Sequence, residues 1–293
     1  MEEIDYWQYD TKFGQPVVKD GCGVFGVIRK PNAPKISNLC AVAAISCIKY
    51  RGSDMGAGYA SFDVSKTNQY KVMAFVKDEK VAATVLEQLS TLLGKPVSSS
   101  LNTPKESKSR FGVLSAHFSY TGHELELERR VDAINSTLLR DRQIDGRIFS
   151  YGRFLSVYKE VGYPMDVAKI YGIDREVEKA DMWIAHTRQP TNSPGSSPIW
   201  SHPFASLDCA IVHNGDISSF GANMEFLNSY GYKSHVGTDS EVISKLLFHL
   251  IRIEGLSVKD AAIILTNPFE GNAPAGSFEM LSRFRGAKLD GPF

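Results

Sequence analysis

The stretch Cys22-Gly23-Val24-Phe25-Gly26-Val27-Ile28 decides the fold of this 293-residue chain. Its β-branched and aromatic residues favour a strand, and its two glycines allow another part of the backbone to approach closely. Pro31 and Pro34 follow and close the strand. Cys22 therefore stands at the end of a predicted strand, where a rigid scaffold can present a functional side chain.

The composition predicts a large globular core and excludes several function classes. Hydrophobic residues make up 43% of the sequence, enough for one big domain or a domain with an insertion. Lys plus Arg and Asp plus Glu each number 33, so no net positive charge attracts nucleic acid or an anionic membrane. The acidic first twenty residues are not a secretory signal, and the apolar stretch 39–48 is too short to span a bilayer. We therefore expect a cytoplasmic protein.

The cysteines predict neither a metal site nor a disulfide framework. No two of the four have C-x-x-C spacing, and the histidines do not cluster with them at the spacing of metal ligands. Cys40 and Cys47 lie in a helical pattern of small apolar residues, and we expect them to pack in the core, as free cysteines often do. The other two are Cys22 and Cys209.

Further along the chain, strand and helix patterns alternate. A helix is predicted over 36–50, and strands over 59–63 and 70–76. The segment 66–178 predicts a small α+β insertion, a packing or partner-docking module with no chemical constellation of its own. Its expected features are a helix capped by Asp78 and ended by Gly94, an exposed loop at 96–109, strands at 111–120 and 148–158, and a helix with Leu127, Val131, Ile134 and Leu138 on one face.

From Met182 onward, apolar strands run directly into polar clusters. The predicted strand 182–185 leads into His186-Thr187-Arg188, and the predicted strand 209–212 leads into His213-Asn214-Gly215-Asp216. Polar groups delivered from the ends of several elements are how a rigid scaffold builds a site. Helices are predicted over 220–230 and 239–253, the second with Thr238 and Glu241 at capping-box spacing.

Five of these blocks resemble, in order along the chain, the signatures of class II glutamine amidotransferases. The five blocks are Cys22-Gly23-Val24-Phe25-Gly26, Arg51-Gly52-Ser53-Asp54, His186-Thr187-Arg188, His213-Asn214-Gly215 and Thr238-Asp239-Ser240-Glu241. Any one block would be a weak signal, whereas five in the family's order are a strong one. The stretches 190–194, 201–204 and 213–217 look closest to the amidotransferase domain of glutamate synthases, in the layout of the free-standing archaeal-type subunit.

The resemblance implies an α+β fold of the N-terminal-nucleophile (Ntn) hydrolase type, a four-layer αββα sandwich with a small α+β insertion at about residues 66–178. In this family the nucleophile is the first residue of the mature chain. Residues 1–21 are therefore expected to be a propeptide, and residues 22–293 the amidotransferase domain. The small Gly21 lets the Gly21–Cys22 bond bend toward Cys22 Sγ. Alternatively, the leader stays and Cys22 is a strand cysteine without a base.

The family's chemistry explains the need for an N-terminal cysteine. The amide of glutamine is a poor electrophile, and a thiol with an ordinary pKa of about 8.5 is little ionised at neutral pH. An α-amino group, with a pKa of about 7.7, can take the thiol proton and later protonate the departing ammonia. The implied reaction converts glutamine and water to glutamate and ammonia through a γ-glutamyl thioester on Cys22.

The remaining roles are implied position by position. Asn214 and Gly215 would form an oxyanion hole, and Arg188 would bind the α-carboxylate of glutamine. Asp239, helped by the backbone at Gly237, would bind the α-ammonium group. A plain Asn-Gly turn, a surface arginine and a carboxylate satisfying a helix dipole are the structural alternatives. Arg51 is implied to order the loop beside Cys22, and Thr191 and His202 to shape the substrate loop. Purely structural roles stay open for Arg51 and His202.

Two features depart from the family pattern. Gln189 follows the His-Thr-Arg triplet where the family often has an aromatic residue, which changes how this loop would close over a substrate. The last residues, 289–293, resemble the start of a further core strand, and no Arg-Asp motif follows them. The sequence is therefore expected to be a fragment, an unusual short subunit or a truncated gene product.

The sequence also predicts what the chain works with. No phosphate-binding Gly-rich loop or iron–sulfur cysteine array is found, so we expect no cofactor in this chain, and FMN and Fe–S clusters only on a partner. The expected partner is a synthase subunit that accepts the ammonia, of glutamate-synthase type. A homo-oligomer stays open. So do two other functions: an Ntn hydrolase that cuts a different amide, and a non-enzymatic docking or regulatory subunit that keeps its leader.

Overall fold

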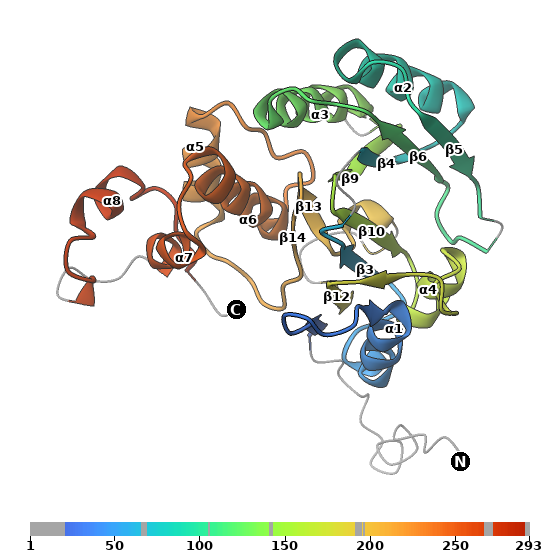
Figure 1. Cartoon of the computed structure of the whole chain (residues 1–293), viewed down its shortest axis with the longest axis horizontal. Coiled ribbons are helices and arrows are strands. Elements are labelled where there is room, and N and C mark those ends of the chain that lie inside the picture. Colours follow the sequence, from blue (N-terminus) through green and yellow to red (C-terminus); the bar gives the residue numbers. More distant parts are fainter. Residues whose placement is uncertain are drawn as a thin grey trace.

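The computed structural model describes residues 21–65, 69–104, 106–140, 143–190, 195, 197–266 and 272–290. Apart from Gly21, the predicted propeptide lies outside these residues. Helices and antiparallel sheets together form an α+β fold (Figure 1). Within the described part of the chain, no helix combines the length and the apolar character needed to cross a membrane.

Two four-stranded antiparallel sheets form the centre of the fold. The first has the strand order β1-β12-β3-β10, and the second has the order β5-β6-β4-β9. The strands of the first are β1 (Gly23–Ile28), β12 (Met182–Thr187), β3 (Ala57–Phe62) and β10 (Leu155–Glu160), and those of the second are β5 (Ser98–Asn102), β6 (Gly112–Phe118), β4 (Tyr70–Val76) and β9 (Gly146–Gly152).

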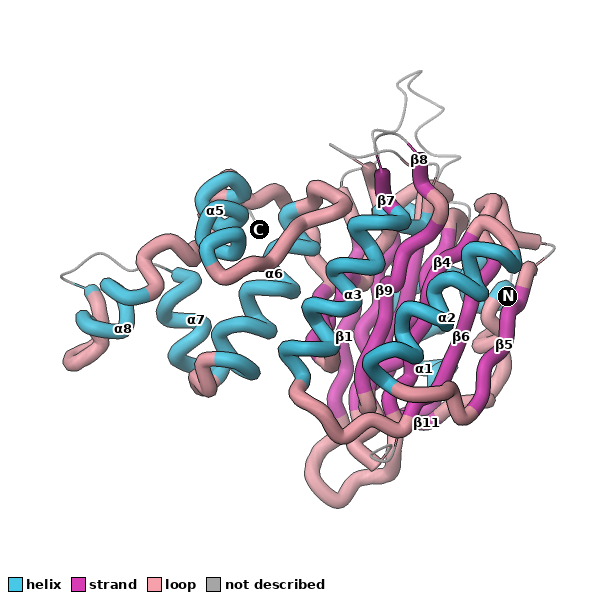
Figure 2. Tube along the Cα trace, turned by 90° about the horizontal axis from the view of Figure 1, so that it is seen from above, coloured by secondary structure: helices cyan, strands magenta, loops and turns pink. Residues whose placement is uncertain are grey.

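Each sheet is covered by two helices. Helices α1 (Asn38–Cys47) and α4 (Pro164–Ile170) pack on the first sheet. Helices α2 (Glu79–Leu93) and α3 (Glu124–Leu138) pack on the second, and Figure 2 shows them lying along its strands. The apolar faces of these helices cover one side of each sheet.

The other sides of the two sheets share a separate core. Side chains alternate across a strand, so Val72 and Ala74 of β4 point to the helices, whereas Met73 and Phe75 point the opposite way. There the ring of Phe75 stacks on that of Phe149, with centroids 4.2 Å apart. Buried residues of both sheets complete this cluster, among them Ala60, Val113, Leu155 and Val157.

Short strand pairs and a helical group surround the sheets. The pairs are β2 (Ile36–Ser37) with β11 (Lys179–Ala180), β7 (Leu139–Arg140) with β8 (Gln143–Ile144), and β13 (Phe204–Ser206) with β14 (Cys209–Ile211). Two short 3-10 helices are η3 (Lys49–Arg51) and η4 (Pro198–Trp200). The helical group at one side of the sheets (Figure 1) comprises α5 (Phe220–Ser229), α6 (Asp239–Leu247), the π-helix η5 (Phe248–Ile253), α7 (Val258–Thr266) and α8 (Phe278–Arg283).

The predicted helix signals are mostly confirmed. The Asp78 carboxylate accepts a hydrogen bond from the N–H of Val81 at 2.8 Å, and α2 ends at Gly94 with φ +77°. Thr238 Oγ1 accepts a hydrogen bond from the N–H of Glu241 at 3.2 Å. The carboxylate of Glu241 binds other groups, so only half of the predicted capping box forms. All four predicted stripe residues of α3 are buried.

The prediction that Cys40 and Cys47 pack in the core is wrong, because both are exposed. Helix α1 buries Ala41, Val42 and Ile45 against the first sheet. Residues 40 and 47 are seven positions apart, so they share a face of the helix and lie away from the buried stripe.

Two predicted elements of the segment 66–178 also differ from the structure. The expected loop 96–109 contains the strand β5, whose residues are all exposed. This edge strand pairs through its backbone with β6, and that pairing needs no apolar side chain. The expected strand 148–158 is two strands, because the chain turns after Gly152. At this turn the carboxylate of Asp208 accepts hydrogen bonds from the N–H groups of residues 153, 154 and 155.

The segment 66–178 takes part in both central sheets. Its strands β5, β6, β4 and β9 make up the whole second sheet. Its strand β10 pairs with β3 in the first sheet, from Leu155 opposite Phe62 to Glu160 opposite Ala57. The described part of this segment therefore shares the common core with the rest of the chain.

Candidate functional site

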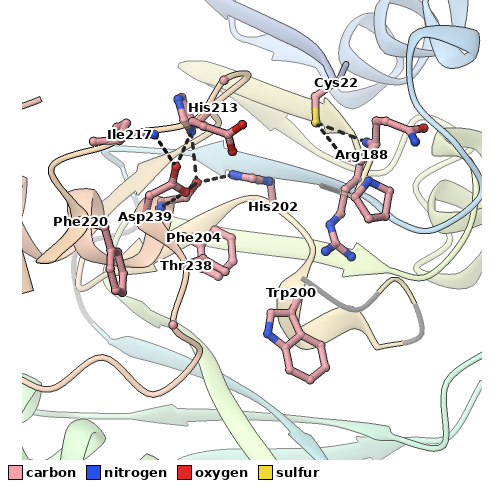
Figure 3. A pocket seen from close by; sticks show the side chains of 16 residues that line it. Cys22, Arg188, Trp200, His202, Phe204, His213, Ile217, Phe220, Thr238 and Asp239 are labelled. Atoms are coloured by element: carbon pink, nitrogen blue, oxygen red, sulfur yellow. Dashed lines mark hydrogen bonds and ion pairs between the residues drawn. The ribbon is translucent and has the colours of Figure 1, made fainter. Parts of the chain in front are cut away.

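Most predicted site residues surround one cavity of about 280 Å³. It opens where β1 begins, where β12 ends and where α6 begins. Figure 3 shows Cys22 and Arg188 on one side of the cavity and Asp239 and His213 on the other. The lining residues are Cys22, Arg188, Gln189, Pro190, Trp200, His202, Phe204, His213, Gly215, Asp216, Ile217, Phe220, Gly237, Thr238, Asp239 and Ser240.

Cys22 is placed by the pairing of β1 with β12. Gly23 lies opposite Thr187, so Cys22 lies beside the chain that continues from β12 into Arg188 and Gln189. The N–H of Gln189 donates a hydrogen bond to Cys22 Sγ at 3.3 Å. The backbone N–H of Cys22 donates to Asn214 Oδ1 at 3.1 Å. The sulfur of Cys22 and its backbone nitrogen are therefore each held by a different neighbouring loop.

Burial raises the pKa of the Cys22 thiol above its ordinary value. The hydrogen bond from the backbone of Gln189 and the positive charge of Arg188 act in the opposite direction but do not outweigh burial. The thiol is therefore protonated at neutral pH, and it needs a base before it can act as a nucleophile.

The block Arg51-Gly52-Ser53 holds Cys22 and the end of β12 together. Arg51 Nε donates a hydrogen bond to the carbonyl oxygen of Cys22 at 3.3 Å. The N–H and the hydroxyl of Ser53 both donate to the carbonyl oxygen of Arg188, at 2.8 and 3.0 Å. A Cβ atom at Gly52 would come within 2.5 Å of Thr187 Oγ1, so this close approach requires glycine.

Arg188 lines the cavity from a buried position, with 3% of its surface exposed. Its N–H donates to the carbonyl oxygen of Gly56 at 2.8 Å, and its Nη1 donates to that of Met55 at 3.4 Å. These contacts fix the side chain against the loop that leads into β3. A planar guanidinium held in this way presents a fixed fork for a carboxylate.

The loop after β14 carries Asn214 and Gly215. Gly215 has φ +147°, a conformation open to glycine, and it lines the cavity. Asn214 is not among the residues that line this cavity, and its carboxamide oxygen accepts the hydrogen bond from the backbone N–H of Cys22. Its carboxamide therefore lies beside the backbone of Cys22 and contacts it through the oxygen.

Asp239 is the first residue of α6, where the helix N-terminus favours a negative charge. Its Oδ2 accepts a hydrogen bond from the N–H of Ile217 at 3.1 Å, and its Oδ1 accepts from the N–H of Ser240 at 2.6 Å. Gly237, with φ +71°, precedes it and also lines the cavity. The carboxylate is thus held on the wall opposite Cys22 and Arg188 (Figure 3).

His202 lines the cavity between these two walls (Figure 3), in contact with a second histidine. Its Nε2 is 2.8 Å from the hydroxyl of Ser240, and its ring centroid is 4.1 Å from that of His186. Burial lowers the pKa of both imidazoles, to about 3 for His186 and well below the ordinary value for His202. Both rings are therefore neutral at pH 7 and act as hydrogen-bonding groups.

Four apolar side chains that line the cavity could not be assigned to it from the sequence. These apolar side chains are Trp200, Phe204, Ile217 and Phe220. Phe204 and Ile217 lie in the stretches 201–204 and 213–217, but nothing in the sequence assigned them to a cavity. Thr191, a predicted site residue, lies outside the described residues. In the part of the chain that is described, no group of His, Cys, Asp and Glu is arranged to hold a metal ion.

Comparisons with known proteins show similarity to glutamine-using enzymes over part of the chain. No model of a protein family matches it. An uncharacterized protein of Archaeoglobus fulgidus is 29% identical over 258 residues, which cover 84% of this chain and 67% of that protein. The glutamine–fructose-6-phosphate aminotransferase (isomerizing) of Francisella tularensis is 39% identical over 98 residues, 32% of this chain. That of Chlamydia abortus is 30% identical over 130 residues, 44% of this chain. The matches span only 15% and 21% of these two aminotransferases.

Proposed function

We propose that this chain is a class II glutamine amidotransferase that hydrolyses L-glutamine to glutamate and ammonia, with Cys22 as the nucleophile. The observation that carries the proposal is the placement of a thiol, a guanidinium and a carboxylate around one cavity. The partial similarity to glutamine–fructose-6-phosphate aminotransferases supports it.

The cavity suits the two charges of an α-amino acid. Arg188 binds the α-carboxylate through its guanidinium fork, and Asp239 binds the α-ammonium group with the help of the Gly237 backbone. Because these groups line the cavity together with Cys22, a bound amino acid can direct its side-chain amide to the thiol. Arg51, Thr191 and His202 shape the loops around this substrate.

The reaction needs the bond between Gly21 and Cys22 to be cut. The nitrogen of Cys22 then becomes an α-amine, which Asn214 Oδ1 holds at the position it has in the structure. This amine takes the proton from Sγ, and the thiolate attacks the amide carbon of glutamine. The N–H groups of the Asn214 carboxamide and of the Gly215 backbone stabilise the oxyanion. The amine gives its proton to the departing ammonia, and water then hydrolyses the γ-glutamyl thioester, which releases glutamate and restores the thiol.

The arrangement of the hydrophobic cores supports the assignment of the chain to the Ntn-hydrolase fold. Two helix-covered sheets that share a core agree with the four-layer αββα sandwich of Ntn hydrolases. In this proposal residues 1–21 are the propeptide and residues 22–293 are the amidotransferase domain, with the segment 66–178 as an elaboration of it.

We further propose that a cytoplasmic synthase subunit takes up the ammonia. A glutamate-synthase-type partner that carries the FMN and Fe–S groups fits the stretches 190–194, 201–204 and 213–217. The aminotransferases match this chain over only a small part of their own length, so their sugar phosphate acceptor is not carried over.

Four measurements test the enzymatic proposal. The intact mass of the native protein should show a chain that begins at Cys22, and this form should release ammonia from glutamine. A diazo-ketone analogue of glutamine should label Cys22 and leave Cys40, Cys47 and Cys209 unlabelled. A mature chain that starts at Cys22 and yields no ammonia, alone or with a synthase partner, contradicts the proposal. A panel of other amides separates glutamine hydrolysis from the activity of a different Ntn hydrolase.

One observation favours a second function. With Gly21 attached, the Cys22 nitrogen is an amide that cannot accept a proton, and burial raises the pKa of the thiol. A native protein that keeps its leader would therefore be a docking or regulatory subunit without glutaminase activity. The intact mass distinguishes this function from the first.

A further inference from the structure

A buried ion pair lies behind the cavity and connects its walls. Arg147 on β9 and Glu241 on α6 meet with Nη2 and Oε1 2.8 Å apart, and their side chains are 5% and 2% exposed. Neither residue lines the cavity. A buried ion pair is weak evidence for stability, because desolvation offsets most of its attraction. We therefore infer the role of the pair from the groups that its two side chains bind.

Glu241 fixes the segment that leads into the Asp239 wall. Its second oxygen, Oε2, accepts hydrogen bonds from Ser234 Oγ at 2.5 Å and from the N–H groups of His235 and Val236 at 3.1 and 3.0 Å. Burial acts to raise the pKa of this carboxyl, but the neighbouring positive charges and hydrogen bonds hold it below the ordinary value. An ionised carboxylate therefore anchors the backbone just before Gly237.

Arg147 contacts the side of the cavity that Trp200 and Phe204 form, here called the aromatic wall. Its Nη1 donates a hydrogen bond to the carbonyl oxygen of Ile199 at 3.4 Å, and its guanidinium carbon lies 5.6 Å from the ring centroid of Phe204. The indole N–H of Trp200 then donates to the carbonyl oxygen of Val236 at 3.3 Å. The two walls are thereby joined twice, once through the ion pair and once through Trp200.

We propose that Arg147 and Glu241 are positioning residues, which set the distance between the aromatic wall and the Asp239 wall of the cavity. This inference rests on the proposed glutamine hydrolysis. Cys22 has its own supports in Arg51 and Gln189, which do not depend on the ion pair. Loss of the pair therefore weakens the binding of the α-ammonium group and leaves the chemistry at the sulfur largely intact.

The test uses two variants of the mature protein. Glu241→Gln keeps the shape of the side chain but replaces one carboxylate oxygen with an NH2 group. Both oxygens of Glu241 accept hydrogen bonds, so in either orientation of the amide this NH2 group faces another donor. Arg147→Lys keeps the charge but loses the fork that reaches both Glu241 and Ile199. Each variant should raise KM for glutamine about tenfold or more, since small displacements of substrate-positioning groups have effects of this size, and should change kcat less than about threefold.

Asn135→Ala is the matched control. Asn135 is buried in α3 and makes two hydrogen bonds with the backbone of Ile148, the residue next to Arg147 on β9. Its loss should lower the melting temperature while KM stays within about twofold of the wild-type value. If this control raises KM as much as Glu241→Gln does, the effect is a general loosening and the proposal is wrong. A KM unchanged in both Glu241→Gln and Arg147→Lys overturns it as well.

A readout without catalysis separates this inference from the proposed function. Acrylamide quenching of the Trp200 fluorescence, taken as the difference from Trp200→Phe, should increase in Glu241→Gln and in Arg147→Lys but not in Asn135→Ala. If the wild-type protein hydrolyses no glutamine, the proposed function fails, and the quenching result alone decides whether the pair positions the walls. Equal quenching in all proteins overturns the inference. If Glu241→Gln does not fold, Arg147→Lys carries the test.

Discussion

Replacing Gly52 with alanine tests how the site is held together. A Cβ atom at this position would lie 2.5 Å from Thr187 Oγ1, 2.9 Å from the carbonyl carbon of Thr187 and 3.0 Å from the nitrogen of Arg188. Ordinary van der Waals contacts begin at about 3.4 Å. Gly52 has φ −90°, so the substitution introduces a steric clash without strain in its own backbone.

The surrounding structure cannot absorb this clash easily. Thr187 pairs with Gly23 on one side and with Ala57 on the other, and the N–H of Arg188 is bonded to Gly56. Overpacking of this kind costs about 1–3 kcal/mol of unfolding free energy. The strain falls on the residue that we assign to the substrate carboxylate, and a displacement of about 1 Å at such a group can cost about 100-fold in rate.

Urea unfolding and kcat/KM for glutamine measure the two effects in the mature protein. Gly221→Ala is the control, because a Cβ there meets nothing within 4 Å. In α5 it should leave activity unchanged and stabilise the helix by up to about 1 kcal/mol. If Gly52→Ala has the stability and activity of the wild-type protein, the close approach of the Arg51 block to β12 does not hold the site in place.

Three further predictions concern single groups of the site. Asn214→Ala should lower kcat about 100- to 1000-fold with little change in KM, and a loss below about tenfold in a steady-state assay argues against its role as an oxyanion donor. Arg188→Lys should raise KM for glutamine because the bidentate fork is lost; equal effects on glutamine and on a glutamine analogue without the α-carboxylate would contradict this. In the chain that retains residue 21, burial raises the pKa of Cys22, so the thiolate is scarce at pH 7 and increases as the pH rises. The rate of its alkylation by iodoacetamide, followed by peptide mass spectrometry, should therefore still increase above pH 9. A rate that reaches its plateau below pH 8 would show that burial does not raise the pKa of this thiol.

The sequence by itself determined the local elements and the order of the site blocks. Hydrophobic periodicity and capping residues depend only on near neighbours, so α2, from its cap at Asp78 to its end at Gly94, could be predicted. The motif Cys22-Gly23-Val24-Phe25-Gly26 likewise indicated a strand that begins at a cysteine, and β1 starts one residue later.

Only the tertiary structure decided which residues share the cavity and how they are held. Trp200, Phe204 and Asp239 line the same cavity, and behind it Arg147 and Glu241 connect a strand and a helix that are far apart in the sequence. Such contacts leave no local pattern in the sequence. The exposure of Cys40 was decided in the same way, since a helix that is apolar on all sides does not specify the face it buries. Local patterns fix backbone conformation through neighbouring residues, whereas burial and side-chain pairing depend on packing partners that are far apart along the chain.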